Sequence, residues 1–173
     1  GVTAHTAGLD GEREPGALDE SFSDIFGFLV ERHGNNGIVN DWLIGEDAIP
    51  LGAISPTVAG LRSLNNPGAF NDPTTFLGLN WVPTNVTNCL DGDGCGIHSN
   101  SSVQNFWFHL LSMGGQHNSA TINGIGIDEA AEIVYLNLTA FMQNASQYAD
   151  ARLGAIAAAR IIFGRCSFEE IET

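Results

Sequence analysis

Hydrophobic residues recur with a helical period near the start of the chain. Between residues 17 and 33 apolar side chains lie three or four positions apart and so share one face of a helix; they are Leu18, Phe22, Ile25, Phe26 and Leu29. Gly34, followed by two asparagines, predicts the end of this helix. A shorter stretch, residues 58–64, predicts a helical turn that ends near Asn65.

The second half of the chain predicts further helices. One apolar set follows the i, i+3, i+4, i+7, i+8 pattern and is expected to stop at the glycine pair 114–115; it contains Val103, Phe106, Trp107, Leu110 and Leu111. Asp128 is typical of an N-cap, here for a helix running to about Met142. Residues 148–163 predict an alanine-rich helix, and residues 167–173 the beginning of another.

Between these helices the chain is irregular, and residues 67–97 form the longest such stretch, rich in Asn, Pro, Gly and Thr. A long loop of this kind inside a compact domain is more often functional than not. No internal repeat and no alternation of strands with helices is visible. The sequence therefore predicts an all-α fold, a single domain over residues 1–173 with a bundle of about five helices and one long irregular loop.

Composition narrows the classes of partner. The chain has 173 residues, of which 43% are hydrophobic, so it contains ample material for a core. Lysine is absent, and six arginines against 20 acidic residues give a formal charge of −14. Such a chain would be repelled by nucleic-acid phosphates. No apolar run approaches the roughly 18 residues that a membrane helix needs, so a membrane is not expected as a partner either.

Two of the three cysteines, Cys89 and Cys95, lie close together in a glycine-rich loop, and Cys166 is left over. This spacing predicts a small disulfide-closed loop, with two neighbouring free thiols as the alternative. A disulfide would require an oxidising, extracellular setting.

Three acidic residues of the first predicted helix, Glu20, Asp24 and Glu31, project within about 40° of one another at 100° per residue. They are interpreted in two ways. They form a solvated acidic face, or they form a column of carboxylates that takes part in metal binding. Zn²⁺ accepts one carboxylate beside two histidines, and Ca²⁺ accepts several oxygens.

A second candidate lies in the string DGDGCGIHSNSS, where Asp93 precedes His98 by five residues at the start of a predicted helix. The string imitates an EF-hand loop, but Ser102 stands where a bidentate Glu is needed. A carboxylate bonded to a ring N–H fixes the tautomer of a histidine used as a proton donor or oxyanion stabiliser. A lone surface histidine is the alternative.

Four ordered blocks of the chain resemble the thermolysin family of zinc metallopeptidases, in the part that follows their HExxH motif. The blocks are TAGL with GALDESFSDIFG, then DWLIGED, then GLRSLNNP, and finally DGDGCGIHSNSSVQNFWFHLL. The resemblance implies the α-helical C-terminal domain of a secreted neutral protease.

The resemblance also implies metal ligands. Glu20 matches the third zinc ligand of the family, and Asp24 matches the carboxylate that supports a zinc-binding histidine. Calcium ligands of the family correspond to Glu31, Asp41 and Glu46. Glu20 is therefore expected to point toward the catalytic histidine, and calcium is expected to stabilise the protein.

Substrate contacts follow from the same match. His98 corresponds to the catalytic histidine with Asp93 as its partner, and Arg62 corresponds to the arginine that binds the substrate carbonyl. Leu61 is expected to line an apolar pocket, which implies cleavage before bulky apolar residues. Asp19 replaces a family asparagine that helps to hold the substrate backbone, so that contact is altered.

Two features differ from the family pattern. The HExxH motif is absent, and by alignment its second histidine would fall just before Gly1; a family tyrosine falls at Gly11. The chain is thus expected to be incomplete at both ends, to carry one zinc ligand of three, and to be inactive alone. Its expected partners are a peptide substrate and the N-terminal half of the same peptidase. The rival hypothesis is a catalytically inactive helical domain with a calcium-binding or structural role.

Overall fold

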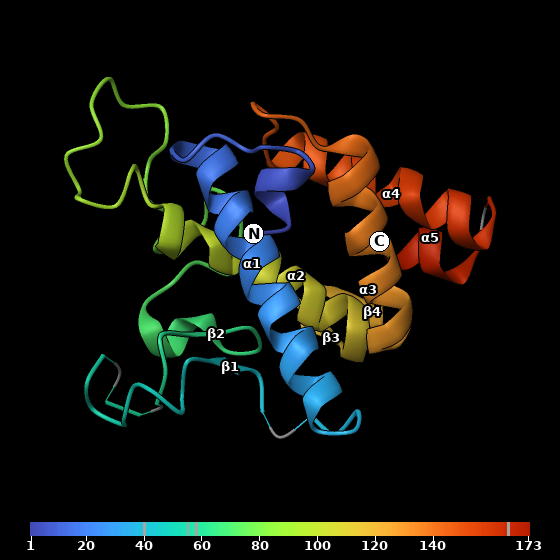
Figure 1. Cartoon of the computed structure of the whole chain (residues 1–173), viewed down its shortest axis with the longest axis horizontal. Coiled ribbons are helices and arrows are strands. Elements are labelled where there is room, and N and C mark those ends of the chain that lie inside the picture. Colours follow the sequence, from blue (N-terminus) through green and yellow to red (C-terminus); the bar gives the residue numbers. More distant parts are fainter. Residues whose placement is uncertain (40, 55, 58, 166) are drawn as a thin grey trace.

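The computed structural model describes residues 1–39, 41–54, 56–57, 59–165 and 167–173, and helices dominate it (Figure 1). The all-α prediction is confirmed. The helices of the described residues are α1 (Arg13–Gly34), α2 (Ile97–Met113), α3 (Ile127–Leu136), α4 (Tyr148–Phe163) and α5 (Phe168–Glu172). Shorter helical turns are the 3₁₀ segments η1 (Thr3–His5) and η2 (Pro67–Phe70) and the π-helical η3 (Asn137–Phe141).

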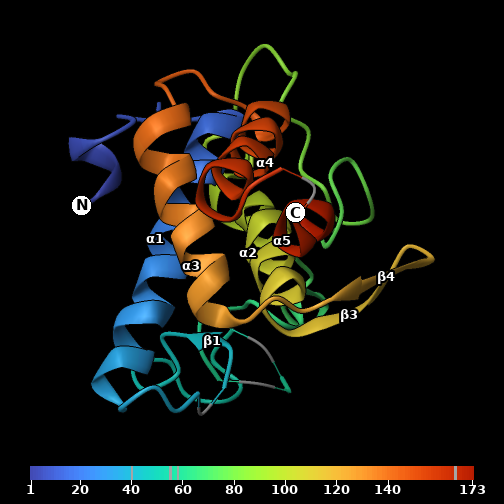
Figure 2. The same cartoon turned by 90° about the vertical axis from the view of Figure 1, so that its right-hand side faces the viewer.

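Two small antiparallel sheets complete the described fold. Strand β1 (Leu43–Ile44) pairs with β2 (Arg62–Ser63), and β3 (Gly114–His117) pairs with β4 (Ala120–Asn123) in a hairpin. Figure 2 shows this hairpin projecting sideways from the helices, to the right. Residues 71–96 contain no helix or strand, which agrees with the long irregular loop expected from the sequence.

The core lies where α1 and α2 pack together at the centre of the molecule, with α3 to α5 on one side (Figure 1). Most of the apolar face predicted for α1 is buried: Leu18, Phe22 and Ile25 are enclosed, and Phe26 and Leu29 are partly buried. Phe28 stacks on Trp42 at a centroid distance of 4.3 Å, and Phe108 of α2 meets both rings. Trp42 thus joins the loop that carries β1 to the two central helices.

Two local predictions were wrong. The turn expected over residues 58–64 is the strand β2 instead, because its backbone pairs with β1; residue 58 itself lies outside the described residues. Asp128 does not cap α3, whose N-cap is Gly126; its carboxylate binds Arg32 at 2.5 Å. The helix expected to run to about Met142 is confirmed in its extent: it is α-helical to Leu136 and continues as the π-helical η3 to Phe141.

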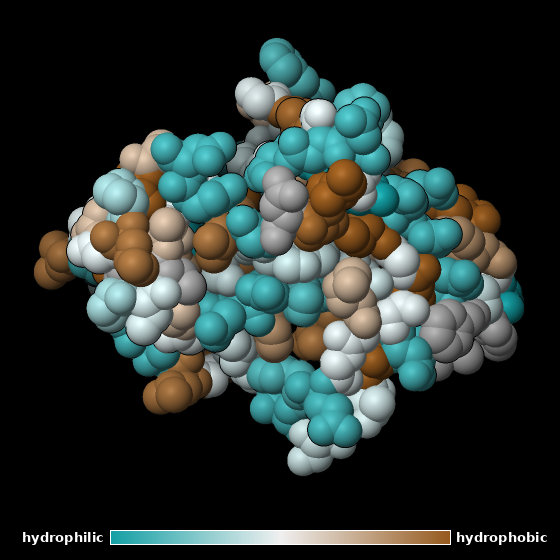
Figure 3. Space-filling view, turned by 90° about the horizontal axis from the view of Figure 1, so that it is seen from below, coloured by the Kyte–Doolittle hydropathy of each residue, from teal (hydrophilic) through white to brown (hydrophobic). Residues whose placement is uncertain are grey.

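The disulfide prediction is confirmed, since Cys89 and Cys95 are bonded. The third cysteine, Cys166, lies outside the described residues. No helix in the described ranges is long and apolar enough to cross a membrane. Seen from below, hydrophobic and hydrophilic residues are interspersed over the surface (Figure 3).

Candidate active site

The centre of the candidate site is His98, the second residue of α2. Asp93 forms two hydrogen bonds with it: one carboxylate oxygen binds the ring atom Nδ1, and the other accepts the backbone N–H of His98 at 3.2 Å. Because a carboxylate can only accept, Nδ1 carries the proton and the ring orientation is fixed. The predicted Asp93–His98 pair is therefore present, and Nε2 is turned away from Asp93.

Glu20 of α1 occupies the side to which Nε2 points. Its Oε2 atom lies 3.5 Å from Nε2 of His98, with side-chain exposures of 30% and 53%. Glu20 and Asp24 both lie on α1 as expected, and Glu20 points toward His98, whereas Asp24 is buried. The two side chains are accessible enough to receive a ligand from solvent.

Arg62 of β2 approaches the same carboxylate from another direction. Its Nη2 atom is 3.7 Å from Oε2 of Glu20. The guanidinium also forms a two-pronged ion pair with Asp24, from Nε and Nη2 at 2.7 Å each. Burial opposes the charged guanidinium, but the hydrogen bond and charge of Asp24 outweigh it and raise the pKa of Arg62.

Asp24 is buried, with 5% of its side chain exposed, so a solvated acidic face is wrong for this residue. Besides Arg62, its Oδ2 atom accepts the amide of Asn105 at 2.8 Å. Asn105 in turn accepts the hydroxyl of Ser21 at 2.8 Å. These donors hold the Asp24 carboxylate in place, and Asp24 in turn fixes Arg62 beside Glu20.

Asp72 is a neighbouring buried acid that sequence reasoning missed. It is 8% exposed and accepts the hydroxyl of Ser102 at 3.1 Å. Burial raises its pKa from 3.8 to about 6, against the lowering effects of Ser102 and of the Arg62 charge. No sequence pattern marks Asp72, because it lies in an irregular segment. Asn105 could have been found, because it lies two helical turns after His98.

A second group of carboxylates lies at the far end of α1. Burial, followed by the charges of Glu46, Asp41 and Asp47, raises the pKa of Glu31. The predicted calcium residues Glu31, Asp41 and Glu46 are therefore near enough to repel one another. In the part of the chain that the structure describes, however, no three His, Cys, Asp or Glu residues are arranged to hold a metal ion.

The remaining substrate candidates lie beside these groups. Leu61 is 40% exposed, and its backbone N–H donates to the carbonyl of Ile44 at 2.7 Å, which continues the pairing of β1 with β2. Asp19 is partly exposed on α1, next to Glu20. Asp19 and Leu61 are thus sequence neighbours of Glu20 and Arg62, and neither makes a contact that assigns it a role.

Comparisons with known proteins show the family and the fold of the chain. The thermolysin metallopeptidase α-helical domain matches residues 7–173. Thermostable neutral protease NprT of Geobacillus stearothermophilus is 37% identical over 170 residues, which are 97% of this chain and 28% of that protein. Bacillolysin of Brevibacillus brevis is 37% identical over 163 residues, covering 94% of this chain and 28% of that protein. The precursor of protealysin, a metalloproteinase from Serratia proteamaculans, superposes with a TM-score of 0.73 at 26% identity, over 99% of this chain and 51% of that one.

The chain belongs to the thermolysin family of metallopeptidases. It corresponds to the α-helical domain of that family and spans 28% of the length of relatives such as NprT.

Membership of a metallopeptidase family implies a metal ion, and catalytic zinc sites use three protein ligands. Among the described residues no such set exists. Glu20 fits the part of a single ligand, because it is a partly exposed carboxylate whose Oε2 faces His98 and Arg62. A metal at Glu20 would therefore need further ligands from outside the described residues.

Proposed function

We propose that this chain is part of a secreted zinc metalloendopeptidase, in which Glu20 is a zinc ligand and His98 stabilises the transition state. One observation carries the proposal: His98 is held by Asp93 on one side and presents Nε2 to Glu20 at 3.5 Å on the other. A carboxylate able to bind a metal, beside an oriented imidazole able to stabilise an oxyanion, suits metal-assisted peptide hydrolysis.

Zinc, when bound, would polarise the scissile carbonyl and activate a water molecule. His98 would donate a hydrogen bond from Nε2 to the carbonyl oxygen as negative charge develops there, a contact that strengthens in the transition state. Asp93 keeps the ring in the required orientation throughout.

Arg62 would bind a substrate carbonyl beyond the cleaved bond. The ion pair with Asp24 fixes the direction of its guanidinium, so little side-chain freedom would be lost on binding. Leu61, partly exposed beside Arg62, would contact the side chain after the cut. This favours substrates with bulky apolar residues at that position, and Asp19 would take part in holding the substrate backbone.

The remaining parts of the proposal concern partners and setting. The other zinc ligands would come from the N-terminal half of the same peptidase. Calcium would bind near Glu31, Asp41 and Glu46, where it would relieve the mutual repulsion of the carboxylates. The disulfide between Cys89 and Cys95 is consistent with an extracellular protein.

The decisive experiment uses the protein expressed from its complete coding sequence. Glu20→Gln should remove zinc, measured by elemental analysis, and should lower kcat/KM on a Leu-containing peptide by more than about a hundredfold, since even outer partners of metal ligands contribute 10- to 100-fold. Glu132→Gln, at an exposed position on α3, is the matched control and should change neither quantity. A complete protein without zinc or peptidase activity would leave only the non-catalytic alternative.

A further inference from the structure

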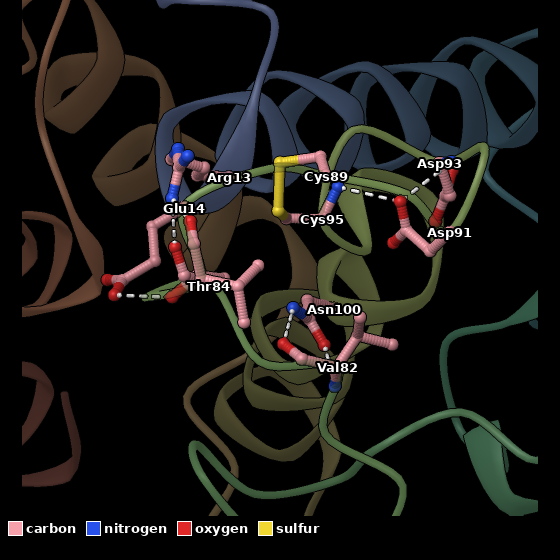
Figure 4. The surroundings of a disulfide bond; sticks show 10 residues. Arg13, Glu14, Val82, Thr84, Cys89, Asp91, Asp93, Cys95 and Asn100 are labelled. Carbon is pink, nitrogen blue, oxygen red and sulfur yellow. Dashed lines mark hydrogen bonds between the residues drawn. A yellow bond between two sulfur atoms is a disulfide. The ribbon is translucent and has the colours of Figure 1, made fainter.

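The loop in front of α2 is closed by the disulfide and shaped by one carboxylate (Figure 4). Oδ1 of Asp91 accepts the backbone N–H groups of Asp93 at 3.0 Å and Cys95 at 3.1 Å. These N–H groups, that of Asp93 first, lower the pKa of Asp91. The backbone of the turn between Cys89 and Cys95 is thus held by hydrogen bonds to the Asp91 carboxylate. Asp93, in the same turn, directs its own carboxylate toward His98.

Arg13 ties both arms of this loop to the start of α1. Its backbone N–H donates to the carbonyl of Gly94 at 2.8 Å. Its Nη1 atom donates to the carbonyls of Thr84 at 2.5 Å and Val86 at 2.9 Å. One residue therefore bonds the segment before the disulfide and the segment inside it, as Figure 4 shows for Thr84.

The backbone of Arg13 indicates that this position is held in place. Its φ of +61° lies in the left-handed region, which is unusual for a residue with a bulky side chain. Such conformations persist where the surroundings over-determine them, and they gather near functional sites. Arg13 also lies two helical turns before Glu20 on α1, so the loop is fixed relative to the helix that carries Glu20.

A second tie connects the loop to α2. The side-chain amide of Asn100 pairs with the backbone of Val82, accepting its N–H at 3.0 Å and donating to its carbonyl at 2.9 Å (Figure 4). Asn100 is two residues from His98 and is fully buried. The loop is thereby anchored to both helices that meet at the candidate site, and Arg13 supplies the anchor on the α1 side.

We propose that Arg13 is a positioning residue for His98: by clamping the disulfide-closed loop to α1, it sets Asp93 against Nδ1 and keeps Nε2 directed at Glu20. This inference rests on the proposed function for its catalytic consequence. The structural part, the orientation of His98, does not depend on peptidase activity.

The test uses the complete protein and three variants. Arg13→Met keeps the aliphatic stem and removes the side-chain donors to Thr84 and Val86, while the backbone N–H that donates to Gly94 stays. Arg13→Lys keeps a cation that can donate to both carbonyls. Arg165→Met changes an exposed arginine after α4. Arg13→Met should lower kcat about tenfold, as expected for an outer partner of a catalytic group, with KM unchanged within about twofold. Arg13→Lys should recover most of kcat, and Arg165→Met should match the wild type.

A second readout separates positioning from overall stability. In protein labelled with ¹⁵N-histidine, the Nδ1–H signal of His98, assigned by its loss in His98→Asn, should exchange faster with water in Arg13→Met. An unchanged His98 signal together with an unchanged kcat, or a lower melting temperature alone, would overturn the proposal. If the wild-type complete protein lacks peptidase activity, the proposed function fails, and the His98 signal still decides whether Arg13 positions the ring.

Discussion

Nε2 of His98 lies 3.5 Å from Oε2 of Glu20, and this relationship joins the two central helices of the fold. It depends on two supports behind the pair. Asp93 holds the ring of His98 from one side, and Arg62, bound to Asp24, lies 3.7 Å from Glu20 on the other. The site is therefore a chain of four charged or polar contacts that no single helix could form.

The buried Asp24–Arg62 ion pair predicts a large effect on stability. Asp24→Ala should lower the free energy of unfolding by about 3 kcal/mol, because it leaves a mostly buried guanidinium without its partner. Urea denaturation measures the change, and Asp19→Ala at a partly exposed position of the same helix is the control. The double variant Asp24→Ala/Arg62→Met should be more stable than Asp24→Ala alone. If its loss of unfolding free energy equals the sum of the losses in Asp24→Ala and Arg62→Met, the two residues are not coupled.

Asp72 predicts a particular pH dependence. Its pKa is raised from 3.8 to about 6, so the native protein binds the proton more tightly than the unfolded chain does. The stability contributed by this proton is complete below pH 3.8 and is lost as the pH rises through about 6. Over that window the loss is about 2–3 kcal/mol.

Asp72→Asn removes this titration. The variant should therefore gain stability relative to the wild type between pH 4 and pH 7, by about 2 kcal/mol. Asn still has an oxygen that can accept the hydroxyl of Ser102. Urea melts at both pH values measure the difference, and Glu132→Gln at an exposed position on α3 is the control. A constant difference between variant and wild type would contradict the raised pKa.

The sequence predicted α1 and α4 well, because a regular apolar period fixes a helix whatever it packs against. Strand β2 and the β3–β4 hairpin were missed, because their short strands depend on partners rather than on their own pattern. Spacing alone also could not bring Glu20, Arg62 and His98 together; the family resemblance did so. Neither residue spacing nor the family resemblance identified Arg13, because it binds the backbone carbonyls of Thr84 and Val86, and side-chain identities do not reveal such contacts.

The carboxylates at the end of α1 predict calcium stabilisation. Burial and the nearby charges of Glu46 and Asp41 raise the pKa of Glu31, so this group contributes stability at low pH that is lost as the pH rises. A divalent cation should restore it at neutral pH. The melting temperature should be higher in calcium than in EGTA at pH 7, and the gain should shrink at acidic pH.

Glu31→Gln tests whether Glu31 is responsible. The variant should lose most of the calcium-dependent gain, while Glu132→Gln on α3 should keep it. Magnesium at the same concentration should give a smaller gain, because Mg²⁺ demands stricter octahedral geometry than Ca²⁺. Equal melting temperatures in calcium and EGTA for the wild type would contradict a calcium site at this place.

The disulfide predicts an effect on catalysis that exceeds its effect on stability. The ring between Cys89 and Cys95 is small, so its chain-entropy contribution should be about 2 kcal/mol at most. The same bond closes the turn in which Asp91 holds the N–H groups of Asp93 and Cys95. In the complete protein, Cys89→Ala/Cys95→Ala should therefore lower kcat several-fold with little change in KM, as Arg13→Met should. Combining the two sets should add little further loss, because both act by loosening the Asp93–His98 contact. Alkylation of the unreduced, denatured protein should modify one cysteine of the chain's three, and modification of all three would contradict the bond.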